Sequence, residues 1–120
     1  MKNIFILLFL MSFLAISFSA NAQEEIVIEG KQIKKSQNVQ FEGRAVYVPQ
    51  KSKITFVEGS STSFSLRIDN FTKYQFYYTE GKYEPPTYSV IIEPGMYELY
   101  PDLPPGIDSV FVRIKLVPIN

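Results

Sequence analysis

The stretch Thr62-Ser63-Phe64-Ser65-Leu66-Arg67-Ile68-Asp69 decides the fold class of this chain. Apolar and polar residues alternate along it, so that Phe64, Leu66 and Ile68 face one way and the residues between them face the other. A period of two is typical of a β-strand with one buried and one solvated face, whereas a helix buries residues at a spacing of three and four. The segment therefore predicts a half-buried strand.

The same alternation recurs on both sides of this strand, and no stretch after residue 23 has the spacing of an amphipathic helix. The predicted strands are residues 25–29, 39–48, 53–56, 62–69, 73–79, 87–93, 96–100 and 109–117. Within 39–48, Gly43 predicts a bulge or a tight bend that turns one strand into two. In 53–56, Ile54 and Phe56 are expected on one face. We expect the strands before and after Gly59 to pair as an antiparallel hairpin.

About seven to eight short strands separated by proline and glycine predict an all-β domain, an antiparallel β-sandwich of the immunoglobulin-like or jelly-roll kind. A small closed β-barrel is the alternative, because half-buried strands occur in both. The chain contains no cysteine and no tryptophan, which excludes an antibody-type domain in the strict sense. Without disulfides, stability has to come from packing, to which Phe and Tyr side chains contribute large buried areas.

Residues 1–22 have the pattern of a cleaved secretory signal peptide. Lys2 supplies the positive end, residues 4–18 are apolar, and Ala20 and Ala22 stand at the small-residue positions before the cleavage site. A retained transmembrane anchor is the alternative. We expect residues 23–120 to form one β-sandwich domain, periplasmic or extracellular, with no stable membrane anchor because no cysteine is present to carry a lipid.

The residue types exclude most catalytic designs. The chain has no His and no Cys, so the commonest general base, the thiolate nucleophile and the usual zinc ligands are missing. Carboxylates at predicted strand ends could in principle serve a glycosidase or bind calcium, but no calcium-loop spacing is present and a thin domain offers little room for a deep cleft. These carboxylates are Asp69, Glu80, Glu84, Asp102 and Asp108. We expect no enzyme activity, no cofactor and no metal site.

Charge argues against nucleic acid as a partner. The chain has 12 basic and 12 acidic residues, whereas nucleic-acid binding is driven by counterion release at a basic surface. Its one basic cluster is Lys31, Lys34 and Lys35. Because Ser36-Gln37-Asn38 follows directly, the cluster is interpreted as a solvated turn.

The segment Tyr88–Leu99 has an apolar strand, a Pro-Gly turn and a Tyr-x-Leu strand. In this arrangement it resembles the jelly-roll and immunoglobulin-like accessory β-sandwich modules attached to secreted bacterial enzymes. The Ala22-Gln23 junction resembles that of secreted Bacteroidetes proteins, and Asp108-Ser109-Val110 resembles a short O-glycosylation acceptor used by some of them. The resemblance implies the architecture and assigns no binding residues.

Tyrosines are dense between residues 71 and 100, and both faces of the predicted strand 73–79 are aromatic. Tyr77 is therefore expected to point outward, with Tyr83 in a loop and Phe111 on the outward side of the last strand. These three residues are the candidate partner-binding site, in a non-catalytic exported module that engages a protein or a cell-surface glycan. The simpler interpretation is that Tyr77 and Tyr83 pack under loops or at a sandwich end.

Two alternatives remain for the function. The same rings could stack on sugars in a carbohydrate-binding module. A structural or subunit role is the other, in which an exposed edge, residues 25–29 or the last strand, adds to the sheet of another chain.

Overall fold

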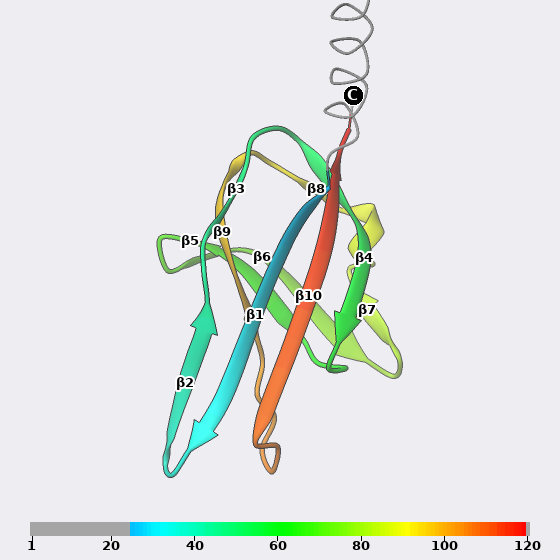
Figure 1. The fold of residues 1–120 in the computed structure, drawn as a ribbon. Helices are drawn as coiled ribbons and strands as arrows, with labels where there is room; N and C mark the ends of the chain where they lie inside the picture. Colours follow the sequence, from blue (N-terminus) through cyan, green and yellow to red (C-terminus); the bar gives the residue numbers. More distant parts are fainter. Residues whose placement is uncertain (1–24, 120) are drawn as a thin grey trace, which may run out of the picture.

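The computed structural model describes residues 25–119, so the signal peptide predicted at 1–22 lies outside the described residues. Within that range the chain is all-β and forms two separate antiparallel sheets of five strands each (Figure 1). The predicted β-sandwich is therefore confirmed. No helix within residues 25–119 is long and apolar enough to cross a membrane.

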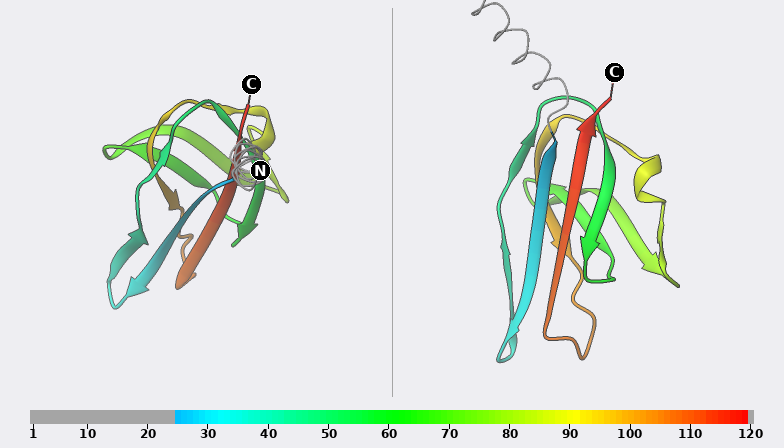
Figure 2. Two further views of the ribbon diagram at one scale, coloured as in Figure 1. Left: turned by 45° about the horizontal axis from the view of Figure 1, so that its top comes forward. Right: turned by 45° about the vertical axis from the view of Figure 1, so that its right-hand side comes forward.

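The first sheet holds, in spatial order, β2 (Asn38–Gly43), β1 (Ile26–Lys35), β10 (Ser109–Pro118), β4 (Ser52–Gly59) and β8 (Ile91–Ile92). The second sheet holds β3 (Val46–Val48), β9 (Gly95–Pro101), β5 (Phe64–Ile68), β6 (Phe71–Thr79) and β7 (Lys82–Glu84). Figures 1 and 2 show β5 and β6 running across the back of the first sheet. The start of β1 and the end of β10 lie together at one end of the sandwich, because Ile26 pairs with Leu116.

The core lies between the two sheets and is built by the alternation that the sequence shows. From β5, Phe64 and Leu66 are fully buried, and from β10 the residues Val112, Ile114 and Leu116 are buried opposite them. The intervening positions on β10 are half-buried on the outer face. Each such side chain contributes about 1.5–3 kcal/mol when fully removed from water, so these alternating strands contribute a large share of the stabilisation.

One side of the sandwich is closed by a strand that changes sheets. The chain leaves the first sheet after Gly43 and joins the second at Val46, which confirms the expected break of one strand into two at Gly43. Beside this crossing the ring of Phe41 stacks on that of Tyr100 at 3.8 Å. The guanidinium of Arg67 lies over the Tyr100 ring at 4.1 Å from its centroid. This stack joins β2 of one sheet to β9 and β5 of the other.

The predicted hairpin at Gly59 is wrong. The strands β4 and β5 belong to different sheets, and β4 pairs with β10 and β8 instead. Gly59 has φ +110° and lies against the carbonyl of Phe111, and Ser60 donates from its backbone N to that carbonyl at 2.7 Å. Turn residues show that the chain changes direction, but they do not determine which sheet the next strand joins.

The strand predicted at 87–93 is also wrong. Thr87–Ser89 forms a short 3-10 helix, closed by the Ser89 amide on the carbonyl of Pro86 at 3.0 Å. Only the two residues of β8 remain extended and paired. The pair Pro85-Pro86 just before this segment has no N–H donors to continue a sheet ladder. As a result Tyr88 is 75% exposed, whereas Ile92 in β8 is buried.

Two further strand boundaries differ from the prediction. An additional edge strand, β7, follows a two-residue turn at Glu80-Gly81. Both turn residues have positive φ, as hairpin turns of this kind require. The lysine cluster lies on β1 and not in a turn, since β1 continues to Lys35 while paired with β2. The turn itself is Ser36-Gln37. The three lysines are nevertheless exposed.

The strands proposed as free edges are largely paired. The last strand, β10, lies between β1 and β4 and is an inner strand. β1 has β10 on one side along Ile26–Ile33, and β2 covers its other side only from Gly30 onward. Residues 26–29 therefore keep one open side. The edge strands of the two sheets are β2, β8, β3 and β7.

Candidate functional site

Tyr77 points outward, as expected, and is 58% exposed on the outer face of the second sheet. Its cross-strand partner on β7 is Glu84, and Gln75 two residues earlier lies on the same face. Its neighbours on that face are polar, so Tyr77 stands as an isolated ring and not as the centre of an apolar patch.

Tyr83 lies at an end of the sandwich. Its ring packs edge-on against Phe64 at 5.4 Å and against Tyr78 at 5.0 Å. Its hydroxyl donates to the carbonyl of Thr62 at 3.0 Å. Burial raises the pKa of Tyr83, and the neighbouring Tyr78 adds to this effect. These contacts fit the simpler interpretation, in which Tyr83 covers the end of the sandwich.

Phe111 is half-buried on the outer side of β10. Because β6 and β10 belong to different sheets, Tyr77 and Phe111 do not lie on one surface. The structure therefore does not bring the three predicted residues together. Phe111 instead has Arg113 as its neighbour, with the guanidinium 5.5 Å from the ring centroid.

Two rows away from Phe111, the outer side of the first sheet carries further exposed apolar side chains. We call the surface formed by Val27, Phe56, Phe111, Arg113 and Lys115 the first-sheet face. Val27, Lys115 and Phe56 stand in one row across β1, β10 and β4. Val27 is 41% exposed and Phe56 47%. The ammonium of Lys115 lies 5.3 Å from the centroid of the Phe56 ring.

Sequence reasoning missed Phe56 because it expected Ile54 and Phe56 on the same face. A β-bulge opposite Lys115 and Leu116 overturns this expectation: Leu116 pairs with Ile54 and Lys115 with Phe56, so Thr55 is an extra residue. An extra residue reverses the facing of the side chains after it in the strand. Ile54 is buried while Phe56 turns outward. No local signal marks this bulge in the sequence.

Arg113 at the centre of the first-sheet face is paired with two carboxylates. Its Nε donates to Glu29 at 3.0 Å and its Nη1 to Glu58 at 2.7 Å. These bonds raise the pKa of Arg113, the hydrogen bond to Glu29 most and the charge of Glu58 next among the favourable effects. Among residues 25–119 these are the only ion pairs.

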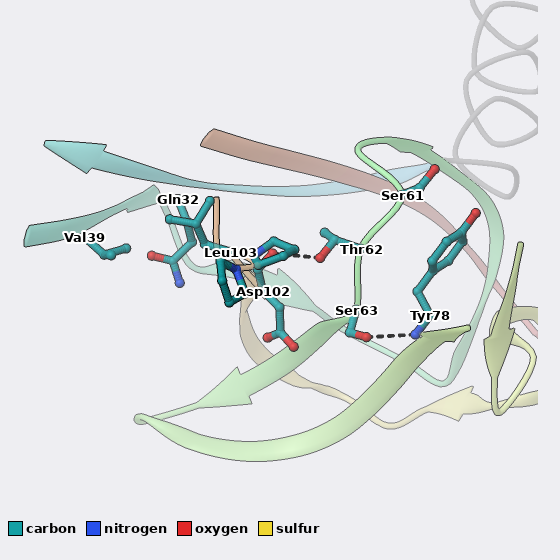
Figure 3. A pocket seen from close by; sticks show the side chains of 10 residues that line it. Gln32, Val39, Ser61, Thr62, Ser63, Tyr78, Asp102 and Leu103 are labelled. Atoms are coloured by element: carbon teal, nitrogen blue, oxygen red, sulfur yellow. Dashed lines mark hydrogen bonds between the residues drawn. The ribbon is translucent and has the colours of Figure 1, made fainter. Parts of the chain in front are cut away.

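A hollow of about 600 Å³ lies at the end of the sandwich where β5 begins and β9 ends (Figure 3). The loop before β5, the loop after β9, β6, and the hairpin of β1 and β2 supply its walls. The lining residues are Gln32, Val39, Ser61, Thr62, Ser63, Tyr78, Asp102, Leu103, Pro104 and Pro105. Figure 3 shows Thr62 and Ser63 between Asp102 on one side and Tyr78 on the other.

Hydrogen bonds hold these walls together. Thr62, only 4% exposed, donates from its hydroxyl to the carbonyl of Asp102 at 2.7 Å. The amide of Asp102 donates to the carbonyl of Ser63 at 2.8 Å, and the amide of Tyr78 donates to the Ser63 hydroxyl at 2.8 Å. The loop before β5, the loop after β9 and β6 are thereby fixed relative to one another.

Residues 25–119 contain no group of three or more acidic, His or Cys side chains that could hold a metal ion. Of the five carboxylates considered from the sequence, only Asp102 lines the hollow. The other four lie in turns or at strand ends on the surface. The arrangement of the described residues can hold a ligand by hydrogen bonds and apolar contact.

Comparisons with known protein families, with characterised proteins and with solved structures find no match to this chain.

Proposed function

We propose that this chain is a non-catalytic exported binding module that engages a protein partner through the first-sheet face. The observation that supports this most directly is that Val27 and Phe56 are exposed on either side of Lys115, while Phe111 lies half-buried on the same face beyond the row of Glu29, Arg113 and Glu58. The ring of Phe56 lies outside the core and is 47% exposed, and aromatic side chains are enriched where proteins bind one another. Tyr77 and Tyr83 have no part in this surface.

The charges on the same face favour one kind of partner surface. Arg113 is paired with Glu29 and Glu58, which together carry one negative charge more than it balances, whereas Lys115 has no carboxylate within ion-pair distance among residues 25–119. Exposed Lys53 lies in the next row of the same sheet, paired with Val117. Exposed apolar side chains on either side of Lys115, with Lys53 nearby, fit a protein surface that has apolar residues with acidic residues beside them.

A comparative capture experiment tests the proposal. The purified protein, a Phe56→Ser/Phe111→Ser variant and a Tyr77→Ser/Tyr88→Ser control are each immobilised and exposed to envelope extract of the source cells. The control removes two rings that are 58% and 75% exposed elsewhere on the surface. At least one protein should be retained by wild type and control and fall about tenfold or more with the face variant.

Melting curves establish that both double variants are folded before capture. Equal recovery of every captured protein by all three baits contradicts the proposal. If the protein forms a dimer at high concentration and only the face variant abolishes it, the partner of the first-sheet face is a second copy of this chain and not a different protein.

A further inference from the structure

The hollow at the end of the sandwich is a separate site from the proposed protein-binding face, because different residues line it. None of its lining residues belongs to the first-sheet face. Its volume of about 600 Å³ lies in the range of small-molecule sites, roughly 300–1,000 Å³. The groups that line the hollow, and how firmly they are held, determine which ligands it could bind.

Four side chains in the wall make no hydrogen bond to another described residue. They are the amide of Gln32, the carboxylate of Asp102 and the hydroxyls of Ser61 and Tyr78. The carboxylate only accepts hydrogen bonds, whereas the amide and the hydroxyls both donate and accept. A ligand with several hydroxyl groups matches this set, since each hydroxyl also donates and accepts.

The backbone beneath these side chains is already ordered. Asp102 is bonded through its amide to Ser63 and through its carbonyl to Thr62, and Pro104 and Pro105 restrict the loop after it. Little conformational freedom is therefore lost in forming the site. Asp102 in particular offers its carboxylate from a main chain that is bonded on both sides.

The charge of the wall limits the class of ligand. It contains one carboxylate and no lysine or arginine, so phosphate, sulfate and uronate groups would meet a negative charge without a compensating cation. The ring of Tyr78 and the side chains of Leu103 and Val39 supply apolar surface for C–H faces. Hydroxyls beside an apolar face are the chemistry of a neutral sugar.

We propose that this hollow binds a neutral saccharide. The Asp102 carboxylate accepts hydrogen bonds from sugar hydroxyls, and the Gln32 amide both accepts from them and donates to them. The apolar side of the sugar ring lies against Tyr78 or Leu103. Ser61 supplies a further hydroxyl at the rim.

Backbone amide NMR titration of the purified protein tests this inference. The probes are D-glucose, D-galactose, D-mannose and N-acetyl-D-glucosamine, with D-glucuronate as the anionic arm and n-butylammonium as the cationic arm. At least one neutral sugar should give saturable shifts confined to the amides of residues 32, 39, 61–63, 78 and 102–103. Glucuronate should bind more weakly than that sugar.

Matched variants identify the groups involved. Asp102→Asn should weaken binding about tenfold, the loss expected for one charged hydrogen bond, because its backbone bonds are kept. Asp108→Asn, an exposed carboxylate in the same loop that does not line the hollow, should change nothing. Gln32→Leu provides a second test on a different strand. The Phe56→Ser/Phe111→Ser variant should keep the sugar response, which separates this site from the first-sheet face.

The inference is overturned if none of the four neutral sugars gives a saturable shift. It is equally overturned if the shifts persist unchanged in both Asp102→Asn and Gln32→Leu, or if n-butylammonium shifts the same amides at lower concentration than every sugar, because Asp102 would then serve as a simple cation site.

Discussion

The substitution Gly30→Ala sets the local preference of a β-strand for alanine over glycine against the close packing of two strands in this sandwich. Glycine inside a strand costs roughly 0.5–1 kcal/mol relative to alanine, so the sequence alone predicts a more stable protein. In the structure β1 crosses β9 at Gly30, and a Cβ built there overlaps the carbonyl oxygen of Leu99 and lies 3.3 Å from Cδ of Pro101. The substitution should therefore destabilise.

The magnitude depends on which atoms are in the way. Overpacking a core typically costs about 1–3 kcal/mol, and the upper end applies because the atom overlapped is backbone in a paired strand and cannot move aside as a flexible side chain would. After subtracting the gain of roughly 0.5–1 kcal/mol for alanine, we expect a net loss of about 2 kcal/mol. A domain of this size has only about 5–10 kcal/mol to lose.

Urea unfolding followed by circular dichroism measures this loss. Gly81→Ala is the matched control, because Gly81 has φ +85° and nothing within 4 Å of its built Cβ. It should cost only the roughly 1–2 kcal/mol of left-handed strain. Gly30 has no such strain, so its measured loss reports the overlap minus the small gain from replacing glycine inside a strand. A Gly30→Ala protein as stable as wild type, or more stable, refutes the close crossing of β1 over β9.

Three further predictions test the core, the first-sheet face and a buried hydroxyl. Phe64→Ala should lower the free energy of unfolding by about 3–5 kcal/mol in urea titrations, since Phe64 is fully buried. Arg113→Met should leave the urea midpoint close to that of wild type, because the ion pairs of Arg113 to Glu29 and Glu58 are partly exposed and screened by water; a midpoint lowered as far as that of Phe64→Ala would contradict this. Burial raises the pKa of Tyr97, and the neighbouring Tyr74 adds to it, so the folded state keeps a proton that the unfolded state loses above about pH 10. Stability should be full below that pH and fall above it, and in melting curves Tyr97→Phe should show a smaller alkaline fall than wild type.

Local patterning predicted much of the fold correctly. Strict alternation at 62–69 and 109–117 matches β5 and β10, whose inward residues are buried as expected except for Ile68, which is only partly buried. Ser65, expected on the solvated face, is buried as well. Gly43 marks the true break in its strand. The errors fall where a local pattern has no information: the pairing after Gly59, the 3-10 turn after Pro85-Pro86, and the length of β1.

The candidate sites show the same division. Tyr77 was correctly expected to be exposed, but its isolation depends on residues of β7. Phe111 belongs to a surface with Phe56 only because a bulge in β4 turns Phe56 outward. In the wall of the hollow, the Thr62 hydroxyl donates a hydrogen bond to the carbonyl of Asp102, which lies 40 positions away along the chain. No spacing rule relates residues at such a distance.

The amino-acid sequence alone determined the strand character of the chain and most of its inward-facing residues, because a period of two is a property of consecutive side chains. Tertiary structure decided which sheet each strand joined, where β1 crosses β9 at Gly30, and which side chains meet at the first-sheet face and in the hollow. Those outcomes depend on a bulge, on a backbone carbonyl under a glycine and on contacts between distant segments, none of which is encoded in neighbouring residues.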